Sequence, residues 1–146
     1  MDEELFVLYT QSHTQFSYMS KIIINSPNAP SPVGPYNHSV LANGTLYVSG
    51  QIAIDPSTGD LVQDSIEAET HMVLKNLGAI LETAGLTYED VLKCTVFVAD
   101  MNMYGRINAI YAEYFKEDTA PARELVEVAN LPKFVNVEIS AIAVKS

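Results

Sequence analysis

The sequence predicts an α+β sandwich, in which a sheet of antiparallel strands carries two helices on one face. Two runs of β-forming residues, 39–42 and 45–48, flank Asn43-Gly44, a strong signal for a two-residue hairpin turn. Between residues 66 and 84 the apolar residues recur at spacings of three and four, which is the period of an amphipathic helix. The remaining segments extend the order to two strands, helix, strand, helix and two strands, which favours the α+β class.

The chain of 146 residues is long enough for one domain with a hydrophobic core. Residues 1–20 are rich in Ser, Thr and Gln and differ in composition from the rest of the chain, so they are interpreted as an N-terminal extension to a single domain of residues 21–146. That domain opens with a short β-branched run at 21–25. The next ten residues, 26–35, contain four prolines and show no periodicity, which indicates an extended loop.

The central helix has start and stop signals of its own. Asp64 and Glu67 stand three residues apart and form a capping pair at its expected start, and Gly85 is expected to end it. Its expected inner face comprises Ile66, Thr70, Val73, Leu74, Leu77, Ile80, Leu81 and Ala84.

The second half of the chain adds one long helix and three strands. A short helical start is expected at 87–90, and Asp100 or Asn102 is expected to cap the second long helix. The apolar face of that helix comprises Met103, Ile107, Ile110, Tyr111 and Tyr114. Strands are expected at 93–99, 123–128 and 135–144. No helix remains to cover the second face of the sheet, so an interface with other subunits is expected there.

The composition narrows the class of partner. The formal net charge is -10, and the lysines are scattered singly, so neither nucleic acid nor an anionic membrane surface is an expected partner. No window approaches the roughly 18 unbroken apolar residues of a membrane helix. The first residues lack the pattern of a signal peptide, and the single cysteine, Cys94, can form no internal disulfide. A cytoplasmic location is therefore expected.

No metal or cofactor motif is present in the sequence. The three histidines, His13, His38 and His71, are far apart, and no Cys/His pair has the spacing of a metal site. A glycine-rich phosphate loop and a serine nucleophile elbow are also missing. We therefore expect no metal and no organic cofactor.

Arg123 is the first candidate for chemistry. It follows Pro121-Ala122 and leads into an apolar strand, where a guanidinium needs an anion as a partner. Its planar fork suits a carboxylate, so a small carboxylic acid is a natural ligand. The alternative is a structural ion pair with one of the 18 acidic residues of the chain. Arg106, the only other arginine, stands in a polar helical context typical of the surface.

Glu138 is the second candidate, because it stands among apolar residues of the last strand. Such a carboxyl can have an altered pKa and serve as a general acid and base, although a solvent-facing position on a half-buried strand is the alternative. Tyr36 and Ser49 also stand out, with Gly50 beside Ser49. The alternatives for Tyr36 and Ser49 are a packed aromatic ring and a strand-end hydroxyl. Spacing alone does not join these residues into one site.

Several short motifs follow one another along the chain: Gly34-Pro35-Tyr36, Val48-Ser49-Gly50-Gln51, Asn108 with Tyr111-Ala112-Glu113-Tyr114-Phe115, Pro121-Ala122-Arg123 with Val126-Glu127-Val128-Ala129, and Val137-Glu138-Ile139. Taken together and in this order, they resemble the RidA/YjgF family of enamine/imine deaminases. The resemblance runs from about Met19 to the C-terminus. It implies a chorismate-mutase-like α+β fold, a homotrimer and a cleft between each pair of subunits.

The resemblance also implies an activity and roles for individual residues. The activity is hydrolysis of 2-aminoacrylate-type enamines and imines to 2-keto acids and ammonia. Arg123 would hold the substrate carboxylate, and Glu138 would activate water and transfer protons. Substrate-binding positions would be Tyr36, Ser49, Gly50, Asn108 and Leu125.

One part of the motif departs from the family. Many members carry a cysteine where this chain has Leu125, and a small hydroxyl residue where it has Glu124. Strand alternation places Leu125 on the same side as Arg123 and Glu124 on the other. A leucine there would make the pocket tighter and more apolar, which bears on substrate size more than on the reaction.

Two other functions compete with the deaminase hypothesis. A non-catalytic protein could use the same cleft to bind 2-keto acids, since binding needs Arg123 but not Glu138. Ribonuclease activity, ascribed to some relatives, ranks lower because of the acidic charge and the lack of basic-aromatic clusters.

Overall fold

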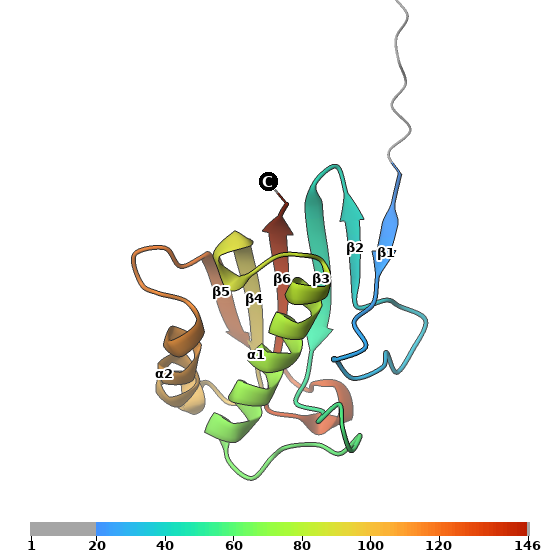
Figure 1. The fold of residues 1–146 in the computed structure, drawn as a ribbon. Coiled ribbons are helices and arrows are strands. Elements are labelled where there is room, and N and C mark those ends of the chain that lie inside the picture. The colour runs from blue at the N-terminus through green and yellow to red at the C-terminus, as the bar shows by residue number, and fades with distance from the viewer. Residues whose placement is uncertain (1–19, 146) are drawn as a thin grey trace, which may run out of the picture.

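A computed structural model describes residues 20–145, in which six strands form one mixed sheet in the order β1-β2-β3-β6-β4-β5 (Figure 1). The strands are β1 (Ile22–Ile24), β2 (Ser39–Ala42), β3 (Thr45–Gln51), β4 (Val91–Val98), β5 (Ala122–Glu127) and β6 (Val137–Val144). The predicted extension, residues 1–20, lies outside the described residues except for Ser20, so its role and the domain boundary stay predictions.

Two helices, α1 (Ile66–Thr83) and α2 (Tyr104–Tyr114), cover one face of this sheet (Figure 1). The core lies between the two layers. Fully buried members include Leu46, Val96, Val98 and Ile139 from the sheet and Val73, Leu77 and Ile107 from the helices. The α+β class and the placement of both helices on one face are therefore confirmed.

The local signals for the hairpin and for the end of α1 are confirmed in detail. Asn43 and Gly44 both have positive φ, 49° and 76°, as a type I′ turn requires. Gly85 follows α1 with a φ of 74°, and its N–H and that of Leu86 donate to carbonyls of the last helical turn. This pairing is a Schellman motif, in which glycine adopts the left-handed conformation without a steric cost.

The predicted start of α1 is wrong by one residue. Ser65, not Asp64, is the N-cap, and its hydroxyl accepts a hydrogen bond from the N–H of Ala68 at 3.1 Å. Glu67 takes no part in the expected capping pair with Asp64, because its carboxylate binds Arg106. Two neighbouring residues with good capping side chains look alike in sequence, and only the path of the chain selects between them.

The short helical segments are 3₁₀ turns rather than α-helices. Residues 88–90 form one such turn, capped by Thr87 and Asp90 in a capping box. Asp100 caps a second turn at 101–103, and α2 begins directly after it at Tyr104. The prediction of Asp100 as a cap is confirmed for this turn, whereas α2 itself has no side-chain cap.

The expectation of a wholly antiparallel sheet is wrong at one edge. Strands β4 and β5 run parallel, and α2 connects them as the crossover helix of a βαβ unit. The short β-branched run near residue 22 also forms a strand, β1, at the other edge of the sheet. The alternation of apolar and polar residues indicates which face of a strand is buried, but it carries no information on strand direction. The direction of β5 relative to β4 depends on the helical connection between them.

The second face of the sheet is uncovered among residues 20–145. Residues such as Tyr47 (51% exposed), Ile23 (41%) and Val126 (41%) point away from the helices. An exposed apolar sheet face of this kind is typical of a protein-protein interface. None of the helices in the described part of the chain has the length and apolar character needed to cross a membrane.

Candidate functional site

Arg123 lies in a cradle formed by α2. Its partner in register on β4 is the buried Cys94, so the side chain of Arg123 points to the helical face of the sheet. Nη1 donates to Oδ1 of Asn108 at 2.9 Å, and Nη2 donates to the hydroxyl of Tyr104 at 3.3 Å. The guanidinium carbon lies 4.6 Å from the centre of the Tyr111 ring, a cation-π distance. Neutral groups thus fix the position of the cation.

No carboxylate pairs with Arg123 within the described residues. The carboxylate partners are elsewhere: Arg106 makes a bidentate pair with Glu67 at 2.7 Å, and Lys93 pairs with Glu124 at 3.0 Å. The alternative considered for Arg123, a structural ion pair, is therefore not found for it in residues 20–145, whereas Arg106 does form such a pair. An arginine held by neutral groups keeps charge and N–H donors for an external anion.

A cleft of about 430 Å³ lies beside Arg123 and Asn108. Its other lining residues are Tyr111, Ala112, Phe115, Glu117, Ala120 and Pro121. Leu125 lies on the same face as Arg123, because it pairs in register with the buried Val96, and it packs against the core. Glu124 points to the opposite face, where it meets Lys93. The sides predicted for both residues are thus confirmed.

Glu138 is the second residue of β6 and is half-buried on the face of the sheet away from the helices. Its side chain rests on the backbone of Gly50. A Cβ added to Gly50 would overlap Oε1 of Glu138 and would lie 2.8 Å from Cδ. A register shift at Ser49-Gly50, where β3 bulges against β6, accompanies this contact. Only a glycine leaves room for the carboxylate there.

Burial raises the pKa of the Glu138 carboxyl above its ordinary value of 4.5. No cation pairs with it within residues 20–145 to offset the loss of hydration. A carboxyl with a raised pKa is a stronger base when ionised and is more easily protonated than an exposed one, which suits a general acid and base. The position of Glu138 on the uncovered face matches the solvent-facing alternative, and its partial burial with a raised pKa matches the acid/base role, so both interpretations stay predictions.

A second cleft, of about 330 Å³, lies over Glu138 and contains four predicted site residues together. These are Tyr36, Ser49, Gly50 and Glu138, joined by Val33, Ile52 and Pro132. The hydroxyl of Tyr36 accepts from the N–H of Val33 at 3.3 Å, and Ser49 donates to the carbonyl of Asn37 at 2.7 Å. The cleft is mainly apolar, and the polar side chains in its lining are Tyr36, Ser49 and Glu138.

The buried His38 fixes the loop that carries Tyr36. Its Nδ1 accepts from the N–H of Ser26 at 2.9 Å, which leaves the proton on Nε2 to donate to the carbonyl of Pro30 at 2.6 Å. The histidine thus fastens the proline-rich segment against the sheet.

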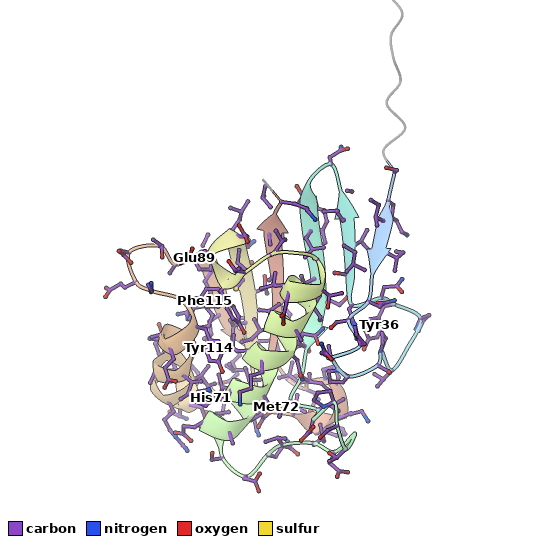
Figure 2. All side chains as sticks on the ribbon, in the orientation of Figure 1. Tyr36, His71, Met72, Glu89, Tyr114 and Phe115 are labelled. Atoms are coloured by element: carbon purple, nitrogen blue, oxygen red, sulfur yellow. The ribbon has the colours of Figure 1, made fainter. Side chains whose placement is uncertain are left out.

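The structure separates the predicted site into two half-sites on opposite faces of the sheet. Arg123 is in register with Cys94, and Glu138 with Phe97, three residues along β4. Strand spacing and rise then put the two Cα atoms about 14 Å apart. Figure 2 shows Tyr36, which lines one cleft, next to β1 and β2, and Phe115, which lines the other, toward α2 at the other edge of the sheet. Arg123 and Glu138 of one chain therefore cannot hold the same small ligand.

Residues 26–145 match the profile of the family described as Endoribonuclease L-PSP. A RutC family protein of Synechocystis is 52% identical over 127 residues, which cover 86% of this chain and 98% of that protein. The chain belongs to the YjgF/RidA family. A human relative named 2-iminobutanoate/2-iminopropanoate deaminase is 43% identical over 129 residues, covering 88% of this chain and 93% of its own.

The solved structures of YjgF/RidA proteins have the same fold. The crystal structure of Escherichia coli TdcF with bound serine has a TM-score of 0.80 and 40% identity, and the match covers 86% of this chain and 99% of that one. The match supports the mixed sheet with two helices.

The sequence analysis did not single out several residues that hold Arg123 or line the Glu138 cleft. Tyr104 and Tyr111 hold the guanidinium together with Asn108. Their spacing of four and three places all three on one face of α2, a signal that was available in the sequence. Val33, Ile52 and Pro132 had no such signal, because loop contacts bring them to the Glu138 cleft. Across residues 20–145, no three His, Cys, Asp or Glu side chains gather to hold a metal ion.

Proposed function

We propose that the protein is an enamine/imine deaminase that hydrolyses 2-aminoacrylate-type intermediates to 2-keto acids and ammonia. The observation that supports this most directly is that Arg123 is held by neutral groups and has no carboxylate partner among the described residues. The half-buried Glu138 supplies an acid/base group, and the human and rodent relatives named 2-iminobutanoate/2-iminopropanoate deaminase provide the reaction class.

The two half-sites meet between subunits of a homotrimer with the chorismate-mutase-like arrangement. The uncovered apolar face of the sheet supports association, because it would otherwise remain in water. Arg123 and Glu138 lie on opposite faces of the sheet, which supports a site shared between subunits. A small ligand that contacts both residues has to take Arg123 from one subunit and Glu138 from another. A sedimentation mass near that of one chain would exclude the shared site.

In the proposed mechanism Arg123 binds the substrate carboxylate and so fixes the imine carbon beside the second half-site. An enamine first takes a proton at C3, which Glu138 donates from its protonated form, and becomes an iminium ion. The Glu138 carboxylate then removes a proton from water as the water oxygen bonds to C2, and a carbinolamine forms.

The same carboxyl completes the reaction. Glu138 donates its proton to the carbinolamine nitrogen, and it accepts the hydroxyl proton as the C–N bond breaks and the C=O bond forms. The products are the 2-keto acid and ammonia, and Glu138 is again protonated, as it was before it gave its proton to C3. The raised pKa of Glu138 suits this alternation, because burial makes the carboxylate a stronger base and favours the protonated form more than in an exposed glutamate. An iminium carbon is already electrophilic, so no step requires a cofactor.

The first test is release of keto acid from 2-aminoacrylate generated in the assay by a serine or threonine dehydratase. The wild-type protein should accelerate release, and Arg123→Ala should abolish the acceleration. Arg106→Ala is the matched control, since Arg106 is committed to Glu67 on the surface. A folded, trimeric wild-type protein without acceleration would reject the proposal.

Leu125 provides a test of the pocket rather than of the reaction. Leu125 lines neither cleft of the single chain but lies two residues from Arg123 on the same face of β5. Leu125→Cys should therefore keep deaminase activity and shift preference among imine side chains, because it changes side-chain volume on that face but no acid/base group. An inactive variant with an intact trimer would contradict this view of the pocket.

The alternative is a binding protein for small 2-keto acids, which the serine-bound TdcF structure favours as a precedent for small-ligand binding. Glu138→Gln distinguishes the two functions. The variant should lose turnover and retain keto-acid binding, since Arg123 is unchanged. Turnover that survives this substitution would remove Glu138 from the mechanism. Ribonuclease activity keeps its lower rank because of the net charge of -10, and RNA binding at physiological salt would reverse that order.

A further inference from the structure

Glu69 is a buried carboxylate for which the proposed reaction has no direct use. It lies in the first turn of α1 and is 0% exposed. Oε1 accepts hydrogen bonds from the backbone N–H of Asn136 at 2.6 Å and of Val137 at 3.3 Å, and Oε2 accepts one from the side-chain amide of Asn136 at 2.8 Å. No lysine, arginine or histidine pairs with it in the described part of the chain.

Both oxygens of the Glu69 carboxyl group act as acceptors. All three partners are N–H donors, and together they occupy both oxygens. The N-terminal end of the helix dipole adds to the stabilisation of the charge. Burying a charged side chain costs free energy unless hydrogen bonds replace those that it made with water. The hydrogen bonds of Glu69 therefore fix the backbone of Asn136 and Val137.

That segment leads directly to Glu138. Asn136 and Val137 precede it in sequence, and the carbonyl of Asn136 is also fixed by the N–H of Ala99 at 2.9 Å. On its other side, the Glu138 carboxylate rests on Gly50 with no room for a further carbon atom. The strand therefore has little freedom to shift at this point without moving the carboxylate.

We propose that Glu69 is a positioning residue, which holds the start of β6 through its three hydrogen bonds and so sets the place of the Glu138 carboxylate over Gly50. The proposal rests on the deaminase function for its kinetic consequence. Glu69 does not touch substrate, since it is fully buried and lines neither cleft.

The kinetic test compares two substitutions at Glu69. Glu69→Met keeps the length of the side chain but removes every acceptor, and kcat should fall by about tenfold or more while KM stays within about twofold. KM is preserved because Arg123 binds the carboxylate in the other half-site. Glu69→Gln keeps one acceptor oxygen for both backbone N–H groups, and the amide of Asn136 can turn to accept from the new NH₂. This variant should recover kcat to within about threefold of wild type.

Leu77→Ala serves as the control for loss of stability alone. Leu77 is fully buried on the same helix and lines neither cleft, so its truncation should lower the melting temperature and leave kcat of the folded protein unchanged. Should Glu69→Met not fold, Asn136→Ala removes one donor of the set and should lower kcat by about threefold with KM unchanged. A folded Glu69→Met protein with the wild-type kcat would overturn the proposal. If the Glu69→Met protein does not fold, a wild-type kcat in Asn136→Ala would overturn it.

A second readout does not depend on turnover. The pKa of the Glu138 carboxyl, followed by carbon NMR, should fall toward the ordinary value in Glu69→Met, because a displaced carboxylate regains contact with water. In Glu69→Gln the pKa of Glu138 should be raised as in the wild-type protein. An unchanged titration in Glu69→Met would overturn the positioning role. An inactive wild-type protein with the expected titrations would reject the deaminase function and leave the positioning role standing.

Discussion

Gly50→Ala should separate activity from stability at the Glu138 half-site. The added Cβ would lie 2.8 Å from Cδ and 3.1 Å from Cγ of Glu138, and it would overlap Oε1. Carbon atoms in contact prefer about 3.5–4.0 Å, so the carboxylate has to move by about 1 Å. A displacement of that size at a reacting group can cost about 100-fold in rate.

The cost in stability should be much smaller. The atoms that meet the new methyl group belong to the end of a flexible side chain, which can turn toward the cleft, so the free energy of unfolding should drop by no more than about 1–2 kcal/mol. Gly105→Ala is the matched control, because nothing lies within 4 Å of a Cβ there and the residue is helical. It should leave kcat unchanged.

The measurement is kcat for keto-acid release together with a thermal unfolding curve for each variant. A Gly50→Ala protein that folds and keeps the wild-type rate would refute the reasoning, because the carboxylate would then work equally well from a displaced position. A protein that does not fold would show that the Glu138 side chain is fixed and cannot turn away.

Further predictions concern pH and packing. Burial penalises the ionised form of Glu138, so turnover that needs the carboxylate should be lost as pH falls through a pKa above 4.5. Glu138→Gln removes a carboxyl that is ionised and destabilising at pH 8 but protonated at pH 4, so it should raise the melting temperature at pH 8 and not at pH 4. Equal effects at both pH values would contradict the raised pKa. Gly78→Ala should cost about 1–3 kcal/mol of unfolding free energy, because its Cβ would displace the Tyr88 hydroxyl from the Leu74 carbonyl; a neutral change in chemical denaturation would count against this. Lys133→Gly should stabilise the fold by up to about 1 kcal/mol, since Lys133 has a φ of 55°, and a lower melting temperature would argue that its side chain contributes packing.

The elements that the sequence predicted correctly depend on neighbours along the chain. The Asn43-Gly44 hairpin, the inner face of α1 and its stop at Gly85 each follow from residues within one or two turns of one another. A β-turn or a helix cap needs specific backbone angles, and only certain residues adopt them at low cost. Family membership was also readable, because its motifs are short and local.

The sequence alone therefore determined the class of fold, the candidate residues of both half-sites and the family. The tertiary structure decided the parallel pairing of β5, the choice of Arg106 over Arg123 for an ion pair, and the division of the candidates between two faces of the sheet. It also revealed that Glu69 binds a segment 67 residues away and that Gly50 has no room for a side chain. The reason is that strand direction, ion-pair choice and close backbone approach depend on which distant segments meet, and the side-chain period that marks a buried face carries no information about that partner.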